Sequence, residues 1–230
     1  MGKMEPATVQ TFWDEGAVLL EGFFNPRELE GIAGEITEHY SITSPTVRPE
    51  NFSPFETRTD PWSPKGGVFE ALTRHPSLVE LTQAVLGAQY ADHPTCLVMQ
   101  TRPMTGQAWH QDTRSDDPAK YVLNRIVYFR DVTPEAGGIV FVPGSHRKGK
   151  LLPGPNYGSL PGEVLLHPKA GTIILLHSFT WHRVDINRSN SPRWSANFRC
   201  RPSSCPEDYD GVGFYRNAGY NFRTMKVQES

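Results

Sequence analysis

The chain has 230 residues, a length that fits one domain with a substantial hydrophobic core. Its formal net charge of -2, with no run of like charges, gives no basic surface for a nucleic acid, and no stretch of about eighteen apolar residues predicts a membrane span. The composition therefore favours a small-molecule partner and leaves the oligomeric state open.

The N-terminus has no apolar signal core, and Pro6 stands where a myristoylation motif requires Ser or Thr. We therefore expect a cytoplasmic protein. The cysteines Cys96, Cys200 and Cys205 are odd in number and form no CxxC motif. Neither a disulfide framework nor a zinc ribbon is predicted from this pattern.

The first periodic segments predict two amphipathic helices. One runs from Asn25 to Tyr40, with Pro26 at its first helical position. The second runs from about Pro76 to Leu86, and Gly87 is placed to end it. We expect this N-terminal region, about residues 8–87, to form an outer helical support.

From about Tyr90 the pattern changes to short β-type runs that Pro and Gly interrupt, which predicts antiparallel sheets rather than βαβ units. The runs cover residues 96–100, 124–129, 138–142, 163–167, 172–177 and 194–199. We predict a mainly β fold with flanking helices and a jelly-roll, cupin-like core over about 90–201. The aromatic segment 202–230 is expected to pack on or over this barrel.

Two separated segments carry metal-ligand residue types. In a strand, residues i and i+2 point to the same side, so His110 and Asp112 can reach one ion together. His182 would then come from a distant strand. Two imidazoles and one carboxylate without a thiolate suit ferrous iron and leave coordination positions open for chemistry. Taken alone, the HxD pair is a weak motif, because such pairs occur by chance in many proteins.

The residues that surround His182 make the pattern more specific. Gly171 opens a predicted strand over 172–177, a short turn leads to His182, and Arg193 follows eleven residues later. Together with the turn Pro143-Gly144-Ser145-His146, this order resembles the phytanoyl-CoA dioxygenase family of iron(II)/2-oxoglutarate-dependent oxygenases. That family has an HxD motif, a Pro-Gly-Ser/Thr-His turn, H-x4-H, and Arg at the same spacing. The match is collinear over about residues 10–201.

The resemblance implies that His110, Asp112 and His182 bind Fe(II), with no catalytic residue beyond these ligands. The cosubstrate 2-oxoglutarate would chelate the iron through its C1 carboxylate and keto oxygen. Arg193 would hold the C5 carboxylate, because a planar guanidinium can bind a carboxylate with two hydrogen bonds. Only His182 places an Arg at the family spacing, so His177 is expected to be a packed histidine.

Other positions are less specific. Gln100 and Asn124 could add amide hydrogen bonds to the cosubstrate, although ordinary polar strand residues explain them equally well. Arg102 and Arg114 flank the HxD motif at the expected barrel mouth, where they would contact substrate or simply be solvated. Trp181, beside the distal histidine, would shield the iron or pack in the core.

One departure from the family is Val184, where relatives often carry a Ser that helps to hold the cosubstrate carboxylate. Asp112 favours hydroxylation or a related oxidation over halogenation, because related halogenases replace this carboxylate with a small residue. We expect an enzyme that uses O2 to oxidise a C–H bond of a small or medium-sized metabolite, releasing succinate and CO2. The alternatives are a catalytically silent sensor that binds metal and 2-oxoglutarate, and a cupin-like metal enzyme that uses no 2-oxoglutarate.

Overall fold

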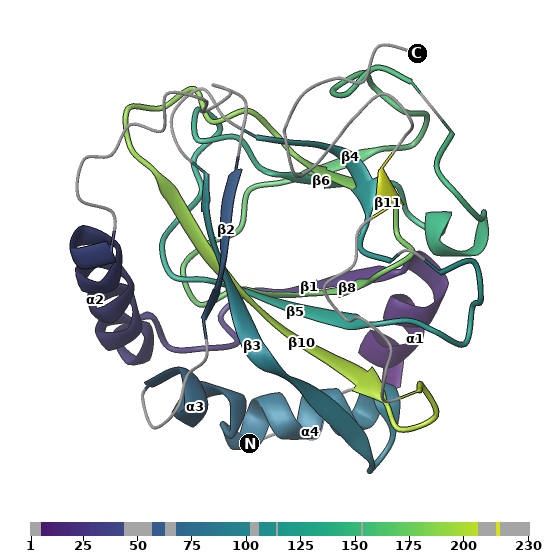
Figure 1. The fold of residues 1–230 in the computed structure, drawn as a ribbon, viewed down its shortest axis with the longest axis horizontal. Helices are drawn as coiled ribbons and strands as arrows, with labels where there is room; N and C mark the ends of the chain where they lie inside the picture. Colours follow the sequence, from purple (N-terminus) through teal and green to yellow (C-terminus); the bar gives the residue numbers. More distant parts are fainter. Residues whose placement is uncertain are drawn as a thin grey trace.

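Two antiparallel sheets face each other and form a barrel (Figure 1). The computed structural model describes residues 6–43, 57–62, 68–101, 106–113, 115–152, 154–206 and 215–216. Short antiparallel strands, rather than βαβ units, follow from the many Pro and Gly residues between the β-type runs. The arrangement confirms the jelly-roll fold that the sequence predicts.

The larger sheet has six strands and the smaller sheet has five. In spatial order, the larger contains β1 (Ala17–Leu20), β8 (Ile173–His177), β5 (Leu123–Tyr128), β10 (Arg193–Pro202), β3 (Tyr90–Thr101) and β2 (Thr57–Trp62). The smaller contains β11 (Tyr215–Arg216), β4 (Gln107–Gln111), β9 (His182–Val184), β6 (Ile139–Phe141) and β7 (Val164–Leu166). Strands distant in sequence therefore become neighbours in both sheets.

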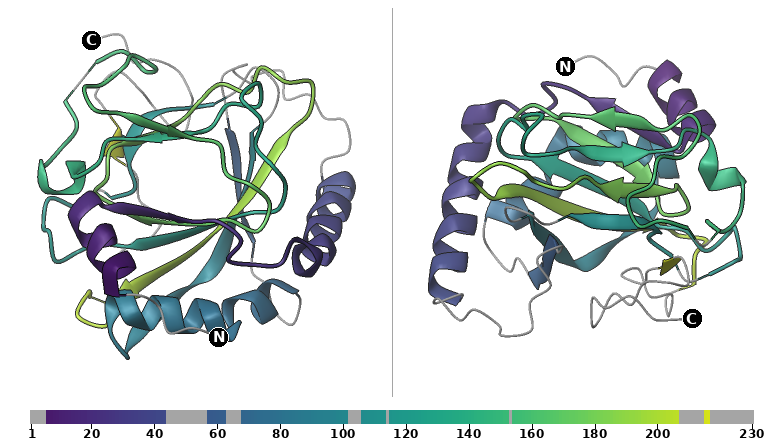
Figure 2. Two further views of the ribbon diagram at one scale, coloured as in Figure 1. Left: turned by 180° about the vertical axis from the view of Figure 1, so that it is seen from behind. Right: turned by 90° about the horizontal axis from the view of Figure 1, so that it is seen from above.

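The helices lie on the outside of the larger sheet, as the two further views make clear (Figure 2). They are α1 (Pro6–Glu15), α2 (Pro26–Thr43), α3 (Val68–Thr73) and α4 (Pro76–Leu86), and a short 3-10 turn, η1, spans Ser145–Arg147. The region expected to be a helical support also supplies the edge strands β1 and β2. Such strands are hard to predict, because a run as short as Ala17–Leu20 is recognised as a strand only through its pairing with β8.

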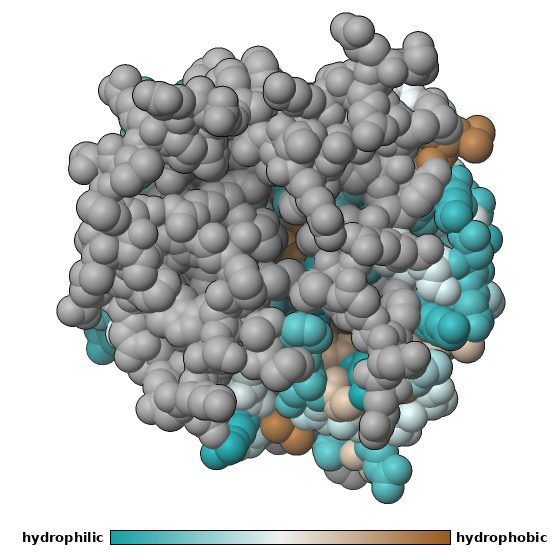
Figure 3. All heavy atoms as spheres, in the orientation of Figure 1, coloured by the Kyte–Doolittle hydropathy of each residue, from teal (hydrophilic) through white to brown (hydrophobic). Residues whose placement is uncertain are grey.

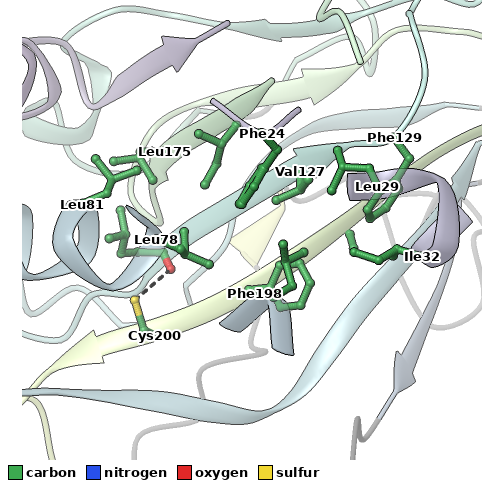
Figure 4. Close-up of a cluster of buried hydrophobic side chains, with 14 of the residues drawn as sticks. Phe24, Leu29, Ile32, Leu78, Leu81, Val127, Phe129, Leu175, Phe198 and Cys200 are labelled. Carbon is green, nitrogen blue, oxygen red and sulfur yellow. Dashed lines mark hydrogen bonds between the residues drawn. The ribbon is translucent and has the colours of Figure 1, made fainter. Parts of the chain in front are cut away.

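Alternation along β5 separates two apolar regions. Leu123 and Val127 face the helices, whereas Ile126 and Tyr128 face the barrel interior. Figure 4 shows the outer region, where Leu78 and Leu81 of α4 pack with Phe198 and Leu175 of the sheet. Each fully buried side chain of this kind stabilises the fold by about 1.5–3 kcal/mol. This layer covers the outer face of the larger sheet and leaves its inner face for other residues.

The outer surface of the described residues gives little indication of function. On the face seen in Figure 3, teal and white areas predominate among the coloured atoms and brown areas are small. The large hydrophobic residues exposed in the described part are Leu152, Val164 and Leu165. None of the described helices is long and apolar enough to cross a bilayer. The informative chemistry therefore lies inside the barrel.

Candidate metal centre

Two histidines meet across the smaller sheet. His110 on β4 and His182 on β9 are direct partners in the antiparallel register, and their ring centroids are 4.1 Å apart. The Nδ1 atoms of His110 and His182 lie 2.8 Å from the carbonyl oxygens of Ala108 and Thr180, respectively. Because a carbonyl only accepts, each Nδ1 carries the proton, and each Nε2 keeps a lone pair for a metal.

Asp112 completes the group just beyond the end of β4. Its backbone N–H donates to the carbonyl of Ser178 at 2.8 Å, which fixes the chain where it leaves the strand. The carboxylate Oδ1 lies 3.4 Å from His110 Nε2, and Oδ2 lies 3.6 Å from His182 Nε2. The ligand atoms of the three buried residues all lie within 4.8 Å of one another. The sequence-based grouping of two imidazoles and one carboxylate is therefore present in space.

The hydrogen bonding of the three residues also suits a bound cation. Asp112 Oδ1 is buried and accepts no hydrogen bond among the residues that the structure describes. A buried carboxylate oxygen without a donor is costly unless something compensates it. A divalent cation between the carboxylate and the two Nε2 atoms would supply that compensation, and mixed nitrogen and oxygen ligands suit iron(II).

Arg199, on the inner face of β10, is a site residue that the sequence analysis missed. Its Nη2 lies 3.1 Å from Asp112 Oδ2, and both side chains are buried. Burial by itself raises the pKa of the Asp112 carboxyl, but the guanidinium of Arg199 lowers that pKa well below its ordinary value. Asp112 is therefore an anion at neutral pH. Arg193 and Arg199 are separated by an even number of positions on one strand, so they face the same side. This spacing could have indicated from the sequence that Arg199 points inward.

Gln111 anchors the metal-bearing strand from its other face. Its Nε2 donates to the carbonyls of Phe179 at 2.8 Å and Gly149 at 3.1 Å. Its Oε1 accepts the N–H of Leu151 at 3.0 Å. As expected from strand alternation, Gln111 points away from the side on which His110 lies. It ties β4 to the turn that precedes the distal histidine.

The Pro-Gly-Ser-His turn holds the backbone immediately before the distal histidine, His182. Ser145 Oγ accepts the N–H of Trp181 at 2.8 Å, and Gly144 adopts the left-handed conformation, with φ 70°. Trp181 itself packs with Trp109 and Val142 on the outer face of the smaller sheet. Strand alternation thus places the Trp181 ring on the side opposite to the His182 ligand nitrogen.

His177 lies on the outer face of the larger sheet, away from the metal group. Its ring stacks on Tyr121 with centroids 4.7 Å apart and contacts Phe12 and Trp13. Burial lowers its pKa to about 3, with a smaller contribution from His146. These surroundings are those of a neutral, packed histidine, in agreement with the choice of His182 as the ligand.

Arg193 begins β10 and is buried, with Nη1 donating to the carbonyl of Ala136 at 3.2 Å. Burial lowers the pKa of the Arg193 guanidinium, whereas the nearby Tyr128 and Asp185 raise it by a smaller amount. Tyr128 pairs with Ser195 in the register, so it is a diagonal neighbour of Arg193 on the inner face. Burial raises the pKa of Tyr128, which keeps its hydroxyl neutral and able to donate.

The remaining expected site residues are placed less directly. Asn124 is buried on the inner face of β5, where its Nδ2 donates to the Leu176 carbonyl at 3.2 Å and its Oδ1 accepts from Asn197 at 2.8 Å. Gln100 lies on β3 opposite Trp194. Two further residues, Arg102 and Arg114, fall outside the described residues.

A family model and a related dioxygenase match most of the chain. The family model described as phytanoyl-CoA dioxygenase (PhyH) matches residues 12–195. The dioxygenase hkm4 of Aspergillus hancockii is 25% identical over 211 residues, covering 81% of this chain and 68% of that protein.

Many solved structures share the fold, and two of them illustrate the likeness. HygX from Streptomyces hygroscopicus, solved with nickel and 2-oxoglutarate bound, matches with a TM-score of 0.72 and 18% identity over 88% of each chain. SnoK, the non-heme alpha ketoglutarate dependent carbocyclase of nogalamycin biosynthesis, matches with a TM-score of 0.70 and 16% identity over 93% of this chain and 97% of that one. At these identities the likeness concerns the fold.

Proposed function

The chain belongs to the phytanoyl-CoA dioxygenase family, as its motifs indicate, and on that premise we propose that it is an iron(II)- and 2-oxoglutarate-dependent dioxygenase. Its reaction is the oxidation of a C–H bond in a small or medium-sized metabolite, with release of succinate and CO2. Hydroxylation is the simplest outcome. The carbocyclase SnoK supports keeping ring formation as another outcome of the same chemistry.

The observation that carries the proposal is the group formed by His110, Asp112 and His182, whose ligand atoms lie within 4.8 Å of one another. Both imidazoles have Nδ1 engaged by a backbone carbonyl, so their orientation is set before any metal binds. Iron(II) and 2-oxoglutarate, when bound, provide the chemistry by which O2 oxidises a C–H bond. The protein residues hold these groups in place and keep water away from them.

Arg193 is proposed to bind the C5 carboxylate of 2-oxoglutarate. A buried guanidinium can hold a carboxylate with two charge-assisted hydrogen bonds, and Arg193 is buried with one donor given to Ala136. The Tyr128 hydroxyl is our candidate for the helper that Val184 cannot provide. Its position beside Arg193 on the inner face, and the mutual effect of the two groups on their pKa values, support this pairing.

The other positions keep weaker roles in the proposal. Asn124 would act mainly by ordering Asn197 and the inner face of β5 and β10, since its amide already bonds within the protein. Gln100 remains a candidate for a cosubstrate contact, and Arg102 and Arg114 remain candidates for substrate contacts. Trp181 would support the loop beside the distal ligand rather than contact substrate, because its ring packs in the outer cluster.

A screen of metabolite pools tests the proposal. Purified protein is loaded with Fe(II) under anaerobic conditions, mixed with 2-oxoglutarate and O2, and assayed for succinate formation that a metabolite stimulates. We expect at least one stimulating pool, loss of that activity in H182Q, and full activity in the matched control H167Q. Binding of iron and 2-oxoglutarate without succinate under any condition would instead support the silent sensor.

A further inference from the structure

The contact between Arg199 and Asp112 suggests that Arg199 has a role at the metal centre beside the three ligands. The guanidinium Nη2 lies 3.1 Å from Oδ2 of the carboxylate, whereas Oδ1 is buried and accepts no hydrogen bond in the described part of the chain. The two oxygens of one carboxylate are therefore in different environments. Both oxygens lie near a ligand nitrogen, Oδ1 at 3.4 Å from His110 Nε2 and Oδ2 at 3.6 Å from His182 Nε2, but only Oδ2 is also held by a cation of the protein.

We infer that Arg199 is a positioning residue that keeps Asp112 a one-oxygen ligand, an inference that rests on the proposed iron and 2-oxoglutarate site. A carboxylate can bind a metal through one oxygen or through both. A bound iron would be held by three protein ligands and would also have to accept a chelating keto acid. If Asp112 bound through both oxygens, it would take a coordination position that the keto acid needs.

The surroundings make the one-oxygen arrangement the stable one. Oδ2 also lies near His182 Nε2, but its use as a second metal ligand would compete with its charge-assisted hydrogen bond to Arg199, and both side chains are buried. Arg199 also comes from β10, in the larger sheet, whereas His110 and His182 lie in the smaller sheet. The carboxylate is thus fixed from both sheets of the barrel.

Calorimetric titration without turnover tests the inference. Protein saturated with Mn²⁺ is titrated with 2-oxoglutarate and with pyruvate, which chelates in the same way but has no second carboxylate. In R199M we expect both keto acids to bind at least about tenfold more weakly, and by the same factor. Loss of a residue that orients a metal ligand typically lowers metal affinity or activity by about 10- to 100-fold. R199K, which keeps a compact charge but not the planar fork, should be intermediate.

R193M is the matched control, since it removes a second buried guanidinium from the same face of the same strand. It should weaken the binding of 2-oxoglutarate and leave the binding of pyruvate unchanged. Thermal unfolding checks that each variant is folded, and R199Q replaces R199M if the latter is not.

The outcomes separate the two proposals. Keto acid affinities in R199M equal to those of the wild type would overturn the positioning role while leaving the proposed function intact. A wild-type protein that binds neither Mn²⁺ nor a keto acid would overturn the proposed function itself.

Discussion

His110 and His182 face each other across β4 and β9 as direct register partners, and each donates Nδ1–H to the carbonyl oxygen two residues before it. The same local arrangement on two antiparallel strands brings both Nε2 atoms to one place. The backbone therefore determines the tautomer of each ring and the side on which a metal can bind.

Replacing Asp112 with Ala should abolish substrate oxidation, because the metal loses its anionic ligand. It should also lower the free energy of unfolding of the metal-free protein by about 3 kcal/mol, since Arg199 loses its buried carboxylate partner. Succinate assays and urea denaturation measure the two effects. Undiminished turnover in D112A would remove Asp112 from the metal site.

Replacing Arg193 with Met should raise the 2-oxoglutarate concentration for half-maximal activity about 10- to 100-fold. Hydrogen bonds to charged groups contribute about 1.5–3 kcal/mol, and 1.4 kcal/mol corresponds to about a factor of ten. The exposed Arg188 offers a matched control, and R188M should behave as the wild type. An unchanged requirement in R193M would favour the cupin-like enzyme that uses no 2-oxoglutarate.

Replacing Tyr128 with Phe should weaken 2-oxoglutarate binding in the same direction but less, by about 2- to 10-fold. One hydrogen bond from a neutral hydroxyl contributes about 0.5–1.5 kcal/mol. Tyr121, which stacks on His177 outside the barrel, provides the control, and Y121F should leave the affinity unchanged. Equal affinities in wild type and Y128F would exclude Tyr128 as the helper for Arg193.

The low pKa of His177, about 3, predicts a pH-dependent contribution to stability. A histidine in the unfolded chain binds a proton below about pH 6.5, whereas the folded His177, packed against Tyr121 and His146, stays neutral down to about pH 3. The unfolded state therefore binds more protons in this window, and stability falls as the pH decreases through it.

The variant H177F isolates this effect. At pH 7 it should be less stable than the wild type by about 1 kcal/mol, because the hydrogen bond from the Phe179 N–H to His177 Nδ1 is lost. By about pH 4.5 the wild type should have lost about 2.5 kcal/mol more than the variant. Urea denaturation of both proteins across this range measures the difference, in which carboxylates common to both cancel. Parallel curves would contradict the low pKa.

Gly16 should tolerate no side chain. It has φ +74°, and a Cβ would lie 2.4 Å from His146 Nδ1 and 2.5 Å from Thr180 Oγ1. We expect G16A to lower the free energy of unfolding by about 3 kcal/mol and to weaken metal binding, because Thr180 orients His182. Gly22 has φ +61° with nothing within 4 Å, so G22A should cost only about 1 kcal/mol. Equal losses would show that the contact is unimportant.

The sequence by itself predicted the antiparallel fold class and the metal group. A period of two places His110 and Asp112 on one side of a strand, whereas the choice of His182 as the third ligand came from the resemblance to the phytanoyl-CoA dioxygenase family. The spacing from His182 to Arg193 also separated His182 from His177. That distinction agrees with the packing of His177 among aromatic rings outside the barrel.

Only the tertiary structure decided which side chains from distant strands meet. Arg199 reaches Asp112, and Asn124 bonds to Asn197, because β5 and β10 are neighbours and the two sheets face each other. Trp181 follows the alternation to the outer face, where it joins the cluster around Trp109. Such contacts depend on strand order and register, which arise from pairing across the whole domain, whereas the period of two within one segment shows only which side of its strand a residue faces.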